Sequence, residues 1–163
     1  MAEFKGVGAT NRPRSALYHN GMSHRVIPDK IVLPTAGVTA ADTIVLAKGI
    51  SLRDTLSSLT IKATTATALV IDIGIRKADG TILDADCLAD GLTVSAMLGN
   101  NILGTSVSGF DASKNLGEHA GKANDYHVAE GVEIYATVKT KNSADGSLLY
   151  EAKLASTTAG DGT

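Results

Sequence analysis

The sequence has little of what builds a disulfide-stabilised or membrane-spanning protein. Its 163 residues include one cysteine, Cys87, so no disulfide can form within the chain. Tryptophan is absent and aromatic residues make up 4%, which suits thin β-layers better than a bulky helical core. No apolar run approaches the roughly 18 residues of a membrane span, and residues 1–10 lack the apolar stretch of a secretion signal. We therefore expect one globular domain, made in the cytoplasm, without disulfides.

Net charge is also small. It is −2 at pH 7, which gives no electrostatic reason to bind nucleic acid or an acidic membrane. The charges are unevenly placed, however. Residues 1–30 contain five basic and two acidic residues, a net of +3, whereas residues 79–133 contain nine acidic and two basic residues, a net of −7. The chain therefore has a basic end and an acidic middle, and neither nucleic acid nor a membrane is expected among its partners.

Residues 1–29 follow no apolar period of 2 or 3.6 and contain glycine or proline at five positions. This pattern predicts an extended N-terminal arm, followed by a β-sandwich domain at residues 30–154 and a flexible, polar tail at residues 155–163. The arm has too many apolar residues for a plain spacer. Arg12, Arg14 and Arg25, with Leu17 and Tyr18 as apolar anchors, are its candidate contacts with another subunit. An inert N-terminal tail is the alternative.

From residue 30 onward, short runs rich in Ile, Val, Leu and Thr are separated by turn residues at a spacing typical of a β-sandwich or barrel. Strands are expected at 30–33, 43–47, 57–63, 67–76, 81–83, 92–98, 132–139 and 147–154. Residues 69–76 and 132–139 alternate between apolar and other residues, which places one face in a core and the other in water. In the second of these strands, we expect Val132, Ile134, Ala136 and Val138 to point inward, and Glu133, Tyr135, Thr137 and Lys139 to point outward.

Turn signals favour antiparallel pairing. Asp79-Gly80 and Asp145-Gly146 each predict antiparallel strands on either side, because Asp-Gly tolerates the positive φ angles of tight hairpins.

Helix signals are weak: residues 51–59 and 84–92 could each form a helical turn or two. Residues 99–127 contain five glycines and predict a long loop of the kind that is usually functional or mobile. The expected fold class is an all-β, antiparallel sandwich.

One candidate metal site is the acidic cluster, by which we mean Asp84, Asp86 and Asp90. Its carboxylates offer the oxygen ligands that a hard cation prefers. An EF-hand loop starting at Asp84 would need glycine and glutamate where this chain has Ala89 and Ser95. Acidic residues in contact with water are therefore favoured over an ion site.

A second candidate site combines His119 and His127 with Glu118 and Asp125, since imidazole and carboxylate are common metal ligands and general bases. No cysteine or third histidine lies nearby, which favours surface histidines.

No nucleophile motif is recognisable in the sequence. Gly-x-Ser-x-Gly is absent, and Cys87 lies among acids that would raise the pKa of its thiol, which favours a small packed residue. We expect no enzyme, no metal and no cofactor. A small metal-dependent enzyme, built on these histidines and the acidic cluster, is the minor alternative.

Three segments carry a resemblance to a known group of proteins. They are DTIVLA at residues 42–47, LVIDIG at 69–74 leading into ADG at 78–80, and EGVEIYATV at 130–138. In this order they look like the small β-rich virion proteins of tailed bacteriophages, which include capsid decoration, or cement, proteins. The resemblance is one of pattern, spans about residues 42–154 and leaves the arm uncovered.

The resemblance implies a jelly-roll-like β-sandwich that binds the outer face of an assembled capsid, often as a dimer or trimer. The implied partners are the major capsid protein and further copies of the chain, and the implied location is the capsid surface of the virion. The implied role is to bridge and stabilise capsid subunits, without catalysis. The alternative is a tail or fibre module that binds a host-surface carbohydrate through residues 99–127, where Phe110 and Tyr126 are the available aromatic platforms.

Overall fold

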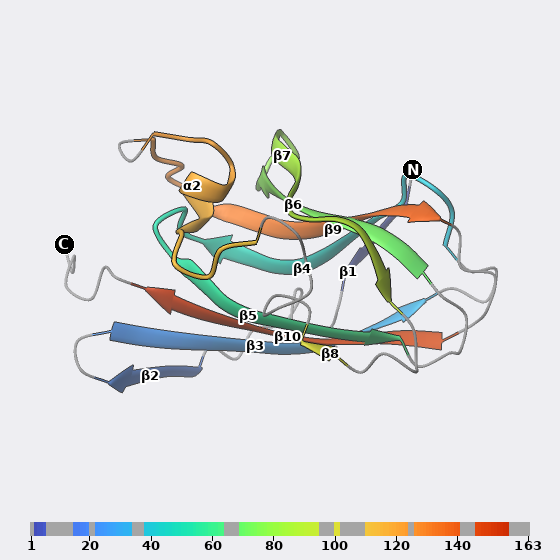
Figure 1. The fold of residues 1–163 in the computed structure, drawn as a ribbon, viewed down its shortest axis with the longest axis horizontal. Coiled ribbons are helices and arrows are strands. Elements are labelled where there is room, and N and C mark those ends of the chain that lie inside the picture. The colour runs from blue at the N-terminus through green and yellow to red at the C-terminus, as the bar shows by residue number, and fades with distance from the viewer. Residues whose placement is uncertain are drawn as a thin grey trace.

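The chain folds into two β-sheets that pack face to face (Figure 1). The computed structural model describes residues 2–5, 15–19, 22–33, 38–63, 69–94, 100–101, 110–123, 126–140 and 146–156. Along residues 4–5, 15–19, 22–29, 62–63, 100–101 and 146–147, and at residues 33 and 156, it describes the backbone alone. Within these ranges, no helix has the length and apolar character needed to cross a membrane.

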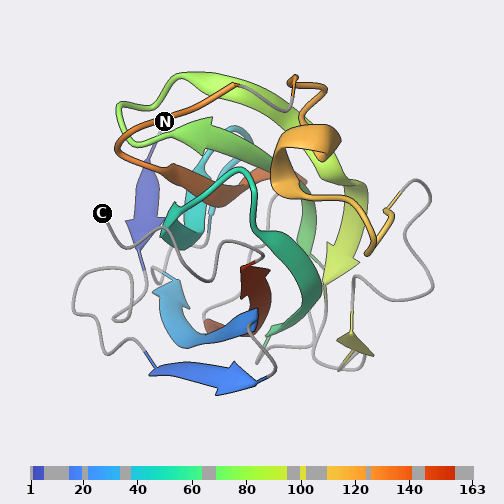
Figure 2. The ribbon, with the colours of Figure 1, turned by 90° about the vertical axis from the view of Figure 1, so that its left-hand side faces the viewer.

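Each sheet has five strands. Sheet A contains, in spatial order, β1 (Glu3–Lys5), β4 (Thr43–Ile50), β9 (Val132–Thr140), β6 (Leu69–Lys77) and β7 (Ile82–Val94). Sheet B contains β2 (Ser15–His19), β3 (Met22–Leu33), β10 (Gly146–Ser156), β5 (Thr55–Ala63) and β8 (Asn100–Asn101). Figure 2 shows the sheets as two layers, one above the other.

Eight of the strands, β3 to β10, have the order of a jelly roll. Sheet B holds β3, β10, β5 and β8 as neighbours, sheet A holds β4, β9, β6 and β7, and each neighbouring pair among them is antiparallel. Because the chain repeatedly passes between the sheets, it winds into the double Greek key that defines this fold. β1 and β2 extend one edge of each sheet, β1 by parallel pairing with β4. The predicted all-β antiparallel sandwich is confirmed.

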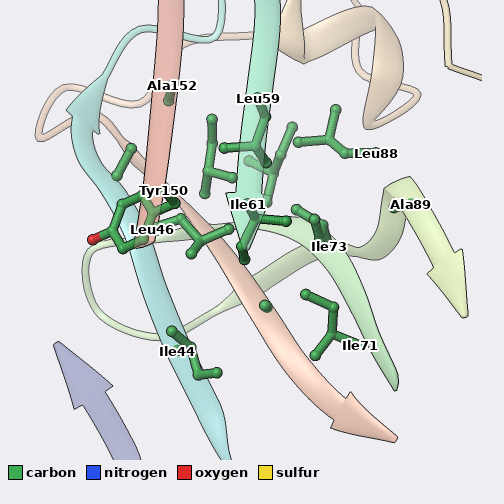
Figure 3. Packing of buried hydrophobic residues seen from close by; sticks show 14 of the residues in the cluster. Ile44, Leu46, Leu59, Ile61, Ile71, Ile73, Leu88, Ala89, Tyr150 and Ala152 are labelled. Carbon is green, nitrogen blue, oxygen red and sulfur yellow. The ribbon is translucent and has the colours of Figure 1, made fainter. Parts of the chain in front are cut away.

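The core lies between the sheets and consists mainly of aliphatic residues. Ile71 and Ile73 of β6 face Leu59 and Ile61 of β5 across this layer, and all four are buried (Figure 3). Burial of each such side chain contributes about 1.5–3 kcal/mol to folding. The inner face predicted for residues 69–76 is confirmed, since Leu69, Ile71, Ile73 and Ile75 are all buried. The prediction of a water-facing side is wrong at Gly74 and Arg76, which are buried as well.

Along β9 the prediction is confirmed for the inner face and wrong for half of the outer face. The four core-facing residues are buried as predicted: Val132, Ile134, Ala136 and Val138. In the outer set Lys139 is exposed and Thr137 is partly exposed, but Glu133 and Tyr135 are buried. Tyr135 lies opposite Gly74 of β6, where residues 85–88 of β7 fold over the outer face of sheet A, and Glu133 is paired with Arg76.

The segment between the two strands expected at 81–83 and 92–98 is itself a strand. Residues 82–94 form the single strand β7, so the helical turn considered at 84–92 is wrong, and residues 95–98 lie outside the described part of the chain. Residues 51–59 also form no helix, since β5 begins at Thr55. In both places pairing with a neighbouring strand satisfies the backbone over a greater length than an isolated turn could.

One helix, α2 (Leu116–His119), lies inside the segment predicted as a long loop. Its N-terminus is a capping box in which Asn115 accepts from the Glu118 amide and Glu118 accepts from the Asn115 amide, both at 2.8 Å. The amides of Leu116 and Gly117 donate to the carbonyl oxygens of Asp54 and Leu52 at 2.9 and 2.8 Å. Residues 115–117 are therefore fixed to the chain that enters β5.

The two Asp-Gly turns have different outcomes. Asp79-Gly80 joins β6 to β7 as an antiparallel hairpin, with a φ of +91° at Gly80, and confirms the prediction. At Asp145-Gly146 the prediction of paired strands is wrong, since β9 lies in sheet A and β10 in sheet B. The chain changes sheet here, so β10 pairs with β3 and β5 instead. Asp145 itself lies outside the described residues.

Part of the segment predicted as an arm belongs to the sheets. β2 pairs with β3, and β3 pairs with β10 from Ser23 to Leu33. The expected boundary at residue 30 therefore falls inside β3, and the strand expected at 30–33 is the end of a longer one.

Candidate functional site

The five arm residues proposed as contacts fall into two groups. Arg12 and Arg14 lie outside the described residues. Leu17 and Tyr18 are neighbours in β2, opposite His24 and Ser23 of β3, so they take opposite faces of that strand. Arg25 lies in β3, opposite Ala16 of β2 and Leu154 of β10. Contact of these residues with another subunit stays a prediction.

The N-terminal strand β1 is held by a buried carboxylate. Asp42, which is 5% exposed, accepts the Ala2 amide on Oδ1 and the Thr39 amide on Oδ2, both at 2.8 Å. These backbone N–H groups, Thr39 first, hold the pKa of Asp42 below its usual value. The Thr43 amide donates to the Ala2 carbonyl oxygen at 2.8 Å, and Glu3 lies opposite Thr43 in the parallel register. Residues 2 and 3 are thus fixed to the start of β4.

A second anchor is the guanidinium of Arg76. Its Nε and one terminal nitrogen donate to Oε2 of Glu133 at 2.8 Å, and the same terminal nitrogen contacts Glu3 of β1. The guanidinium also lies over the Tyr135 ring, 5.0 Å from its centre. Burial alone would lower the pKa of Arg76, but hydrogen bonds and charge from Glu3 and Glu133 raise it above its usual value. We call Asp42, Arg76 and the edge of β4 from Thr43 to Val45 the β1 seat.

This charged layer was not predicted, because alternation assigned Glu133 and Tyr135 to solvent. The cover comes from β7, which rises above β6 (Figure 1). Between the pairs Ile75–Asp84 and Ile73–Ala89, β7 has residues 85–88 where β6 has Gly74 alone. A Cβ at Gly74 would lie 2.3 Å from the Asp84 carbonyl oxygen. A glycine inside a strand pattern was the available signal, since it marks a close approach of another backbone.

The acidic cluster lies in and beside this bulge. Asp90 contacts Nζ of Lys139 at 2.5 Å, and the same nitrogen contacts Asp72 at 3.0 Å. Hydrogen bonding to Lys139 lowers the pKa of Asp90. A hydrogen bond with Asp84 raises the pKa of Asp86. Among the described residues, His, Cys, Asp and Glu side chains form no group of three that could hold a metal ion.

Cys87 is partly buried against the core, as its prediction as a packed residue requires. Burial, followed by the charges of Asp84 and Asp86, raises the pKa of its thiol to about 12. The thiol is therefore protonated at neutral pH.

The two histidines of the candidate site have separate surroundings. His119 stacks on Phe110, with ring centres 5.0 Å apart, and its Nε2–H donates to the Asp111 carbonyl oxygen at 2.9 Å. Burial lowers the pKa of His119. His127 is exposed in an open pocket of about 240 Å³ beside Asp79. Of the two carboxylates expected beside these histidines, Glu118 caps α2, and Asp125 lies outside the described residues.

The aromatic platforms considered for a carbohydrate are only partly available. One face of Phe110 is taken by His119. Tyr126 is exposed, and Nζ of Lys122 lies 5.9 Å from its ring centre. Stacking against a sugar ring needs a free aromatic face, which Tyr126 offers more readily than Phe110.

An exposed aliphatic pair lies on the outer face of sheet B. Val32 of β3 is 70% exposed and Leu149 of β10 is 41% exposed. Val32 lies opposite Ser147, and Leu149 lies opposite Lys30. The two aliphatic residues are therefore diagonal neighbours on one face. We call Val32 and Leu149 the sheet B patch.

Comparison with known proteins finds one distant likeness. No protein-family model matches the chain, and no curated protein matches it. Among solved structures, the chain is similar to one described as "Cyanophage Pam1 capsid asymmetric unit". The identity is 15%, the match covers 91% of this chain and 95% of the other, and the TM-score is 0.47. This likeness is too distant to place the chain in a family.

Proposed function

We propose that the chain is a virion structural protein that binds the outer surface of an assembled bacteriophage capsid and cements neighbouring subunits. The strand order of β3 to β10 carries the proposal, because the jelly roll is an architecture of viral capsid and lectin domains. The step from fold to role is an analogy. It agrees with the resemblance of residues 42–154 to phage virion proteins.

Cementing needs a protein that binds the assembled shell and not its free subunits, since whatever binds only one state stabilises that state. A specific contact usually buries about 800 Å² per partner, which is about a tenth of the 8333 Å² surface of this chain. Many copies, each bridging two subunits, would add their contributions across the shell. The partners are then the major capsid protein and further copies of the chain, as a dimer or trimer, on the virion surface.

The sheet B patch supports the outer face of sheet B as the capsid-binding face. Val32 and Leu149 expose aliphatic surface there. Aliphatic surface that loses water in an interface favours binding. The outer face of sheet A, in contrast, is covered in part, where residues 85–88 of β7 fold over Gly74.

Co-sedimentation with empty shells of a phage major capsid protein tests the proposal. The double variant Val32→Asp/Leu149→Asp should weaken binding about tenfold or more, the effect of losing roughly 1.4 kcal/mol at an interface. Ile82→Asp is the matched control, because Ile82 is also an exposed aliphatic residue, but on β7 of sheet A. A deletion of residues 2–27 would not test the predicted arm contacts alone, because it would remove β1, β2 and part of β3, so point variants are used.

Heat resistance of shells with and without the chain then measures cementing directly. Shells that carry the chain should withstand a higher temperature, and the double variant should lose this gain. Equal resistance, or no co-sedimentation, would contradict the cementing role. Binding to glycans in place of shells, abolished by Tyr126→Ala, would favour the carbohydrate-binding alternative.

A further inference from the structure

The β1 seat belongs to the jelly-roll body and not to the N-terminal segment that occupies it. Asp42 directly precedes β4 and Arg76 lies near the end of β6. One oxygen of Asp42 is fixed by the Thr39 amide, and Arg76 is fixed by Glu133. Both groups therefore have partners within the body that hold them in place whether or not β1 is present.

The features that the seat recognises are few and specific. From β1, Asp42 accepts one backbone N–H, that of Ala2. The Ala2 carbonyl oxygen in turn accepts the Thr43 amide. Arg76 then pairs with the carboxylate of Glu3. Backbone pairing with a sheet edge, combined with one side-chain contact, is a common way for a sheet to bind a separate extended segment. The same contacts would form with residues 2–5 of any copy of the chain.

The tether that follows β1 gives it reach. Residues 6–14 join Lys5 of β1 to Ser15 of β2. Fully extended, a tether of this length spans about 30–35 Å. That distance is about the diameter of a small domain. An exchanged strand replaces each contact by an identical one, so exchange between copies costs no contact energy.

Charge favours a second copy of this chain as the source of the strand. Residues 1–14, which contain the strand and its tether, have a net charge of +2, and residues 79–133 have a net charge of −7. Several of these acids are exposed on the described surface: Asp79, Asp86, Asp90, Asp111, Glu118 and Glu130. The basic end of one copy is therefore attracted to the acidic middle of another, and such complementarity steers association.

We infer that β1 of one copy occupies the β1 seat of a second copy, so that the chain oligomerises by exchange of its N-terminal strand. This inference does not depend on the proposed role in a capsid. The exchanged strand adds to sheet A, whereas the proposed capsid contacts lie on sheet B, so failure of one proposal leaves the other intact.

Disulfide trapping between co-expressed full-length chains tests the exchange. In a Cys87→Ser background, one chain carries Lys5→Cys and the other carries Val45→Cys, positions that are register partners in β1 and β4. A disulfide between them can form only if β1 of one copy lies on β4 of the other. The control pair is Lys5→Cys with Val32→Cys, since Val32 is highly exposed but lies in sheet B. We expect a covalent dimer severalfold more abundant than in the control.

A single chain that carries both Lys5→Cys and Val45→Cys distinguishes an exchanged β1 from a β1 that stays on its own body. Exchange gives covalent dimers or larger species, whereas a β1 that stays on its own body gives a monomer with an internal disulfide. The internal disulfide, with no dimer above the control, would overturn the inference.

Discussion

Replacing Arg76 by methionine should destabilise the fold far more than the same replacement of Lys139. Both cations lie on the outer face of sheet A, and each contacts two carboxylates. They differ in burial: the Arg76 side chain is 10% exposed and the Lys139 side chain is 44% exposed. Since methionine keeps a flexible apolar chain at either position, the comparison isolates the effect of removing the charge.

The expected loss follows from what Arg76→Met leaves behind. Glu133, itself buried, would lose its cation, and removing one partner of a buried ion pair costs about 3–5 kcal/mol. Loss of the contact with the Tyr135 ring adds about 0.5–1 kcal/mol. The Glu3 contact adds little because Glu3 is a third exposed. Allowing for water at the rim of the site, we expect a loss of about 3 kcal/mol. Lys139→Met should cost much less, because Lys139 is 44% exposed and Asp72, its partly buried partner, still accepts the Gly91 amide at 2.7 Å.

Urea unfolding followed by circular dichroism measures this difference. With a slope of about 2 kcal/mol/M, a loss of 3 kcal/mol lowers the midpoint by about 1.5 M. The double variant Arg76→Met/Glu133→Gln should recover part of the loss, because no unpaired charge is then buried. Equal midpoints for the Arg76 and Lys139 variants, or no recovery in the double variant, would refute the reasoning.

Three further changes test other parts of the structure. Gly74→Ala should cost about 1–3 kcal/mol, because its Cβ would lie 2.3 Å from the Asp84 carbonyl oxygen; an unchanged urea midpoint would contradict the close crossing of β7. Because the pKa of Asp42 is lowered, the stability it gives to β1 is present above about pH 4 and is lost as the pH falls through the lowered pKa. Amide exchange at Ala2, corrected for its intrinsic rate, should therefore accelerate in acid, and Asp42→Asn should remove that pH dependence. Cys87, whose thiol pKa is about 12, should resist iodoacetamide at pH 8 until the chain unfolds; labelling of the folded chain would show that the thiol is not buried as described.

The sequence by itself determined most of the strands and the residues that face the core. In β6 and β9 every second residue is aliphatic or alanine, and since side chains of a strand alternate in direction, this pattern alone decides which face can enter a core. The Asp79-Gly80 turn is equally local, because its two residues supply the backbone angles that a tight hairpin needs. Features set by neighbours in the chain could therefore be predicted.

Only the tertiary structure decided which strands pair and which outward-facing groups are buried. β9 and β10 follow one another across an Asp-Gly turn, yet they lie in different sheets. Glu133 and Tyr135 have the sequence pattern of solvent-facing residues, yet Glu133 is buried in a pair with Arg76, and Tyr135 is buried opposite Gly74, over which residues 85–88 of β7 fold. The anchoring of Ala2 by Asp42 joins residues 40 positions apart. Alternation within a strand specifies its two faces but not its neighbours, so contacts between distant segments were settled only when the sheets assembled.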